Sequence, residues 1–112
     1  NQKRRIICVF QPHRYSRVKN LKNEFASSFK LSDLVVLCPV YSAGEKERYN
    51  FDQKKFSQLI NKKSEIQVVN VRDQSDLKNF FKRNLSNNEM IICMGAGSIS
   101  NWLKDISKEL WI

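Results

Sequence analysis

The fold is decided by the stretch Ile6-Ile7-Cys8-Val9-Phe10-Gln11-Pro12-His13-Arg14-Tyr15-Ser16-Arg17. Residues 5–10 are almost continuously apolar, which is typical of a strand buried on both faces of a parallel sheet. Further along, apolar residues recur at spacings of three and four, and this predicts a helix over residues 16–30. These residues are Val18, Leu21, Phe25, Ala26 and Phe29. Residues 10–17 are therefore expected to form the turn between a first strand and a first helix.

This turn is rich in positive charge, because it holds the only histidine of the chain, His13, and two arginines, Arg14 and Arg17. In open α/β sheets, ligands bind at the carboxyl ends of the strands. A helix N-terminus adds N–H donors, and arginines three residues apart share a face where the helix has begun. We expect the turn to favour an anion. On composition alone an ordinary solvated basic loop is favoured over an anion site, and these residues by themselves name no substrate.

Three further apolar runs predict strands at residues 34–38, 66–71 and 89–94, and Pro39 prevents the first of these from extending further. Helical patterns separate the runs and follow the last one, with a turn at Asn87-Asn88. Strands that alternate with helices predict an open, mainly parallel α/β sheet with helices on both faces. A length of 112 residues suits a single domain.

Polar residues mark the expected helix starts. Ser16 is the expected N-cap of the first helix, Asp52 that of a helix over 53–62, and Ser75 that of the third helix. The last helix follows the glycine-containing turn 95–98. Its expected core face consists of Ile99, Trp102, Leu103, Ile106 and Leu110.

The composition limits the partners. Lysine and arginine number 20 against 11 acidic residues, a net charge of +9 that admits a polyanion. The charge is dispersed over helix faces, without an aromatic RNA-binding motif, so nucleic acid is not favoured. Cys8, Cys38 and Cys93 form no CxxC pair, which predicts a reducing, cytoplasmic setting and no zinc site. No apolar run approaches the roughly 20 residues that a membrane span requires.

Three loops at strand ends carry the chemistry, namely 11–17, 39–45 and 95–98, and a parallel sheet can bring all three to one edge. The Gly-Ala-Gly-Ser turn of the third loop resembles half of a dinucleotide-binding fingerprint but lacks the third glycine. A tight strand-to-helix turn explains these glycines more simply. The chain contains no GxxxxGK[ST] phosphate-binding loop.

Three motifs together, in this order, resemble the C-terminal domain of the bacterial Mur ligases, and among these the alanine-adding type. The motifs are Phe10-Gln11-Pro12-His13-Arg14-Tyr15-Ser16-Arg17, Tyr41-Ser42-Ala43-Gly44-Glu45 and Gly95-Ala96-Gly97-Ser98-Ile99. The first is specific, whereas the third is generic on its own. The resemblance covers nearly the whole chain and implies a Rossmann-like fold for it. It implies that residues 1–112 are this domain, truncated at its N-terminal edge because the helical segment that usually opens the domain is missing.

The resemblance implies an ATP-dependent ligase that joins L-alanine to UDP-N-acetylmuramic acid in peptidoglycan precursor synthesis. ATP and Mg²⁺ would be bound mainly by a central domain, and the UDP-sugar by an N-terminal domain of the same chain. The domain would work in the cytoplasm, with neither nucleic acid nor membrane as a partner. Residues 1–112 alone would be inactive.

The family's His-Arg-x-x-Arg motif matches His13, Arg14 and Arg17, so the resemblance implies that these residues, with Tyr41, contact the amino-acid carboxylate and phosphate. Arginine suits such a role because it is planar, bidentate and always charged. No catalytic residue and no metal ligand is assigned to this domain. The residues expected to support the loops are Tyr15, Ser16, Ala43, Gly44, Glu45, Gly95 and Gly97.

Two departures from the family pattern limit what is carried over. Pro39 stands where many relatives place an acidic residue, so a role for that acid is not transferred. Residues 46–51 lack the Pro-Ile that often follows the second motif, which leaves the course of that loop open. The competing hypothesis is a non-catalytic basic α/β module that binds nucleotide or nucleic acid.

Overall fold

The computed structural model describes residues 4–86, 88–95 and 97–110. Asn87 of the expected turn, Ala96 of the third loop and residues 1–3 at the N-terminal edge lie outside the described residues. The elements follow in the expected alternating order. They are β1 (Arg5–Gln11), α1 (Tyr15–Ala26), β2 (Leu34–Leu37), α2 (Gln53–Ser64), β3 (Gln67–Asn70), α3 (Gln74–Asn84), β4 (Glu89–Gly95) and α4 (Ile99–Leu110).

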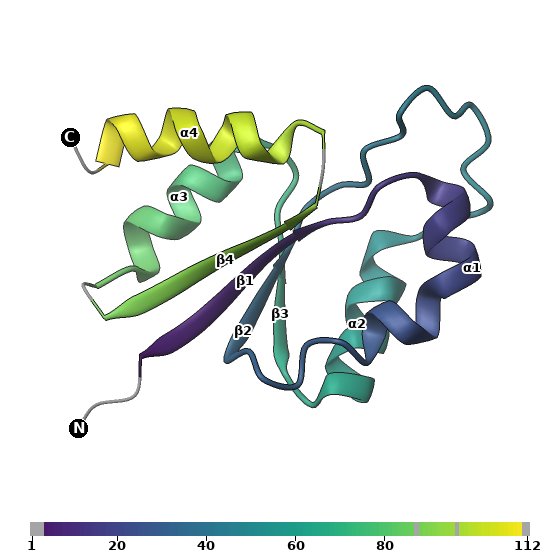
Figure 1. Ribbon diagram of the computed structural model, residues 1–112, viewed down its shortest axis with the longest axis horizontal. Helices are drawn as coiled ribbons and strands as arrows, with labels where there is room; N and C mark the ends of the chain where they lie inside the picture. The colour runs from purple at the N-terminus through teal and green to yellow at the C-terminus, as the bar shows by residue number, and fades with distance from the viewer. Residues whose placement is uncertain (1–3, 87, 96, 111–112) are drawn as a thin grey trace.

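The sheet is parallel throughout, with the strand order β3-β2-β1-β4. Val9 of β1 is paired with Val36 of β2 on one side and with Cys93 of β4 on the other. Helices α1 and α2 lie over one face of the sheet, and α3 and α4 lie over the other (Figure 1). The predicted open, Rossmann-like α/β arrangement is therefore confirmed.

Side chains alternate along β1 between two separate cores, as the geometry of a strand requires. Ile7 and Val9 pack in the core under α3 and α4. Cys8 and Phe10 pack in the core under α1 and α2. Because both faces of the central strands are covered, their sequences read as continuous apolar runs rather than as alternating ones.

The edge strand β4 is covered less completely. Met90, Ile92 and Met94 are 38–42% exposed, and the core under α1 and α2 contains no residue of β4. These three residues pair with residues of β1 whose side chains point to the α1 and α2 side. One face of β4 is thus partly open. Among the described residues no helix combines the length and the apolar character needed to span a bilayer.

Two of the three expected helix caps are wrong. Helix α1 begins at Tyr15, so Ser16 lies inside its first turn, and Arg14 occupies the cap position without a side-chain bond. Helix α3 is capped by Asp73 rather than Ser75, because the Asp73 carboxylate accepts the N–H of the third helical residue. A carboxylate at this position also complements the helix dipole. The expected cap Asp52 is confirmed by its bond from a backbone N–H of α2, at 3.2 Å.

Helix lengths also differ from the predicted ones. Helix α1 ends at Ala26 instead of residue 30, because the hydroxyl groups of Ser27 and Ser28 donate to carbonyl oxygens of the last turn. Such local side-chain bonds compete with continuation of a helix. Helix α2 continues to Ser64, two residues beyond the prediction. The Ser64 hydroxyl donates to the Ala26 carbonyl at 2.6 Å, which ties the ends of α1 and α2 together.

Candidate functional site

The first two loops meet just beyond the strand ends. His13 and Tyr41 form a parallel bridge that continues the pairing of β1 with β2. The N–H of Arg14 donates to the Tyr41 carbonyl at 2.7 Å, and the N–H of Tyr41 donates to the Pro12 carbonyl at 2.9 Å. The expectation that loops 11–17 and 39–45 share one edge of the sheet is therefore confirmed.

Gln11, the last residue of β1, connects all three loops. Its side-chain Nε2 donates to the Pro39 carbonyl at 3.2 Å and to Ser98 Oγ at 3.1 Å, while its Oε1 accepts the N–H of Ile99 at 3.0 Å. The residue is only 2% exposed, so these bonds have little competition from water. Sequence reasoning did not single Gln11 out. The available signal was a polar residue at the end of an otherwise apolar buried run.

The glycines of the third loop allow close approach to the other two. Gly97 has a φ of +93°, and a Cβ there would lie 2.5 Å from Cγ of the Tyr41 ring. Gly95 has a φ of +144°, and a Cβ there would lie 2.6 Å from the Gln11 carbonyl oxygen. Only glycine fits such positions without displacement of a neighbour. The geometry thus supports a tight turn and gives no indication of a dinucleotide fingerprint.

His13 and Arg17 line one hollow of about 310 Å³ at the end of the sheet. The His13 ring stacks on the Tyr41 ring, with the centroids 5.6 Å apart and the planes 24° apart. The remaining lining residues are Phe10, Gln11, Leu21, Phe25 and Gly95. The hollow therefore combines two basic side chains with an apolar wall, which suits a small anion with an apolar part.

The two arginines do not share a helical face. Arg14 precedes α1 with a φ of 69° and is exposed, whereas Arg17 lies within the helix. The expectation that Arg14 and Arg17 share a face required the helix to have begun at Arg14. The left-handed backbone at Arg14 excludes such a helix start. Arg17 is consequently the arginine that lines the hollow.

The N-terminus of α1 already holds an anion, the carboxylate of Glu45. Its Oε1 accepts the N–H of Ser16 at 3.2 Å, and its Oε2 accepts the Ser16 hydroxyl. The hydrogen bond from the Ser16 side chain lowers the pKa of Glu45, while burial opposes the shift and backbone N–H groups and the charge of Arg14 add to it. An external anion would therefore depend on side chains in the hollow and not on this helix terminus.

The other loop residues have structural roles. Ala43 and Gly44 have φ values of 51° and 88° in a turn closed by the N–H of Glu45 and the Ser42 carbonyl, at 3.0 Å. This turn presents Glu45 to α1. Tyr15 points away from the hollow, and its ring lies 5.7 Å from the ring of Phe51.

The described residues do not fit a metal site. No cluster of three or more histidine, cysteine, aspartate or glutamate side chains occurs in residues 4–86, 88–95 and 97–110. Burial, with the nearby Cys93 thiol, raises the pKa of Cys8 to about 11 and that of Cys38 to about 12. Both thiols therefore stay protonated at neutral pH and are poor nucleophiles.

Fold and site together define an open, Rossmann-like α/β domain with a basic hollow at the carboxyl ends of its strands. No family model matches the chain. Curated relatives do match it, and three of them carry the name UDP-N-acetylmuramate–L-alanine ligase. They are from Pelagibacter ubique (strain HTCC1062; 45% identical over 101 residues), Fusobacterium nucleatum (39% over 106) and Prochlorococcus marinus (strain NATL1A; 36% over 108).

These matches cover 90%, 95% and 96% of this chain but only 22% of each relative. The chain thus spans about a fifth of the length of the curated relatives it matches. Nearly all of it is similar in sequence to a region of UDP-N-acetylmuramate–L-alanine ligases. The resemblance to the alanine-adding Mur ligases, first indicated by three short motifs, is confirmed.

Proposed function

We propose that this chain is the C-terminal, amino-acid-binding domain of an ATP-dependent ligase that adds L-alanine to UDP-N-acetylmuramic acid in the cytoplasm. The proposal rests on the similarity to ligases of that name and on one structural observation. That observation is the joining of the first and second motifs through the His13–Tyr41 bridge. ATP, Mg²⁺ and the UDP-sugar are assigned mainly to the parts of the relatives that this chain does not cover.

In this proposal the hollow holds the negatively charged groups of the reaction. The amine of L-alanine attacks an acyl phosphate on the sugar's lactyl group, an amide bond forms and phosphate leaves. The Arg17 guanidinium and the His13 ring bind the alanine carboxylate or the departing phosphate, with Tyr41 orienting His13 and Arg14 adding positive charge nearby. A preorganised cation at such a position stabilises charge that develops in the transition state. Residues 1–112 alone lack a phosphate-binding loop and are expected to release no phosphate from ATP.

The test is the substitution Arg17→Ala in the full-length ligase. Loss of one preorganised charged contact should raise the free energy of the transition state by about 2–4 kcal/mol. This lowers kcat/KM for L-alanine roughly 30- to 1000-fold. Arg17→Lys should recover only part of the loss, because an ammonium group lacks the bidentate geometry. The matched control is Lys63→Ala, which removes a positive charge from the exposed last turn of α2.

The measurement is steady-state kinetics with L-alanine varied at saturating ATP and UDP-sugar, together with a thermal melt of each variant. A folded Arg17→Ala enzyme with wild-type kinetics would remove Arg17 from the site. Equal losses in Lys63→Ala would instead indicate a diffuse effect of surface charge. Tight retention on heparin with a steep salt dependence would favour the nucleic-acid alternative.

A further inference from the structure

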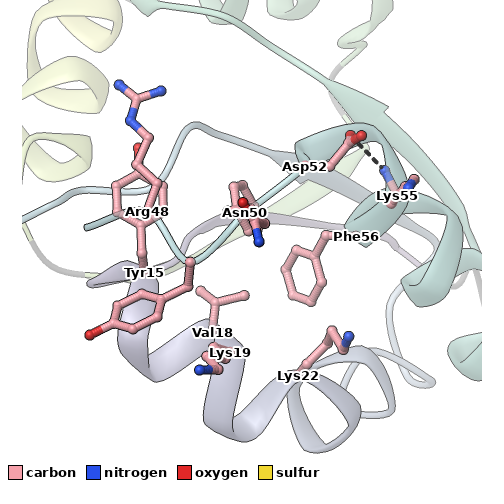
Figure 2. Close-up of a pocket in the computed structure, with 11 residues that line it drawn as sticks. Tyr15, Val18, Lys19, Lys22, Arg48, Asn50, Asp52, Lys55 and Phe56 are labelled. Atoms are coloured by element: carbon pink, nitrogen blue, oxygen red, sulfur yellow. Dashed lines mark hydrogen bonds between the residues drawn. The ribbon is translucent and has the colours of Figure 1, made fainter. Parts of the chain in front are cut away.

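A second cavity, of about 180 Å³, lies between α1, the loop 46–52 and the start of α2 (Figure 2). Its buried floor includes Val18 and Phe56, which are 1% and 3% exposed. The helix α1 separates this cavity from the hollow, because Val18 and Lys22 face the cavity while Arg17 lines the hollow. The two sites therefore share a helix but use different faces of it.

The rim of this cavity is strongly basic. Four cationic side chains line it, those of Lys19, Lys22, Arg48 and Lys55. In the part of the chain that the structure describes, none of the four takes part in an ion pair. The one carboxylate in the lining, Asp52, accepts the N–H of Lys55 as the cap of α2 (Figure 2). Four positive charges against one negative charge favour an anionic ligand, and a dianion over a monoanion.

The walls of the cavity are aromatic, with the side chains of Tyr15, Tyr49 and Phe51. Lys19 Nζ lies 4.8 Å from the centroid of the Tyr49 ring, and Arg48 Cζ lies 5.6 Å from that of the Tyr15 ring. Two of the four cations thus lie beside aromatic rings of the cavity lining. A flat ring can stack on such a wall while a negatively charged substituent meets the ammonium groups.

The turn 48–51 forms the part of the cavity wall that lies opposite α1. Tyr49 and Asn50 have φ values of 55° and 58°, and the N–H of Phe51 donates to the Arg48 carbonyl at 3.0 Å. Two consecutive positive φ values with this bond are typical of a type I′ turn. Positive φ is uncommon for residues other than glycine, so the turn is a defined feature rather than an extended connection. It places Arg48 and Tyr49 in the lining of the cavity.

We propose that this cavity binds a phosphate monoester that carries a single planar ring, such as a pyrimidine 5′-nucleotide. An apolar cavity of about 150 Å³ accommodates a benzene molecule, so the cavity here is large enough for one ring. A phosphate monoester carries a charge of about −1.5 to −2 at neutral pH, which matches the excess of cations on the rim. This proposal does not depend on the ligase substrates or on the ligase reaction. Failure of one of the two proposals would therefore leave the other unaffected.

The test is a calorimetric titration of the chain with cytidine 5′-monophosphate (CMP), alongside cytidine and inorganic phosphate. CMP should bind at least about tenfold more tightly than either part alone, because ring and phosphate contacts contribute together. Amide NMR shifts should change in residues 15–22 and 48–56. Equal affinities for CMP and inorganic phosphate, or no binding of CMP, would overturn the proposal. Tighter binding of oligocytidylate than of CMP would also overturn it, in favour of a surface for single strands.

The location of the site is tested with a charge-matched pair of double variants. Lys22→Gln with Lys55→Gln removes two exposed rim charges and should weaken CMP binding about tenfold or more. Lys30→Gln with Lys63→Gln removes the same charge from exposed positions outside the cavity lining and should leave the affinity unchanged. Equal losses in both double variants would show a diffuse basic surface. An unchanged affinity in the rim variant would place bound CMP elsewhere, and either result refutes the proposal.

Discussion

Replacement of Gln11 should separate the three loops at the carboxyl edge of the sheet. The side chain is 2% exposed and bonds to Pro39, Ser98 and Ile99. Gln11→Met keeps nearly the same volume but leaves a carbonyl, a hydroxyl and an N–H without their partner. One buried group left unpaired costs about 1–3 kcal/mol. Because the hydroxyl of Ser98 can rotate toward water, we expect a loss of about 2–4 kcal/mol in the free energy of unfolding.

The assay combines urea unfolding with native-state hydrogen exchange. The N–H of Ile99 is the first donor of α4, and Gln11 Oε1 is its acceptor. In Gln11→Met this amide should therefore exchange faster than expected from the global loss of stability. The N–H of Trp102, which donates to the Ser98 carbonyl within the same helix start, reports on the helix itself. It should follow only the global change.

The matched control is Gln58→Ala on the exposed side of α2, where a change within about 0.5 kcal/mol is expected. A Gln11→Met protein with a change as small as that of the control, and with full protection of Ile99, would refute the role of Gln11. A large loss of stability with normal relative protection of Ile99 would show instead that Gln11 contributes through packing alone.

Two further predictions concern the loops. Gly97→Ala should destabilise the fold by about 1–3 kcal/mol more than Gly44→Ala in urea unfolding, because both have a positive φ but only a Cβ at Gly97 collides with the Tyr41 ring. Equal effects would mean that backbone strain alone matters. The pKa of Glu45 is lowered by its bond to Ser16, so this contribution is present above the ordinary pKa of about 4.3 and is lost as pH falls below it. Glu45→Gln should therefore flatten the acid limb of the stability curve, and an unchanged limb would contradict this reasoning.

The order of elements and the parallel sheet were predictable because they depend on local patterns. The continuous apolar runs at β1 and β2 indicate strands buried on both faces, and strict alternation with helices leaves a parallel sheet as the simplest arrangement. The placement of loops 11–17, 39–45 and 95–98 at one edge then follows from parallelism, since every strand ends on the same side.

The features that sequence reasoning missed depend on contacts between distant residues. Ser16 is a good capping residue by composition, but Glu45, 29 positions away, binds the start of α1. Gln11 bonds to residues 28 and 88 positions away. Residues 46–51 lack the Pro-Ile of the family pattern, and the tight turn there depends on a positive φ at Tyr49, a residue type that does not favour one. No local pattern carries this information.

The polar residues at the carboxyl ends of the strands have different roles, and this explains why positive charge remains available in the hollow. Gln11 joins the loops without adding any charge. The acid Glu45 is bound to Ser16 at the helix start. Within the described residues, Arg17 forms no ion pair. A cation that is held in the first turn of a helix and lacks an internal counterion needs little reorganisation to bind an external anion, and this preorganisation is what the proposed role in carboxylate or phosphate binding requires.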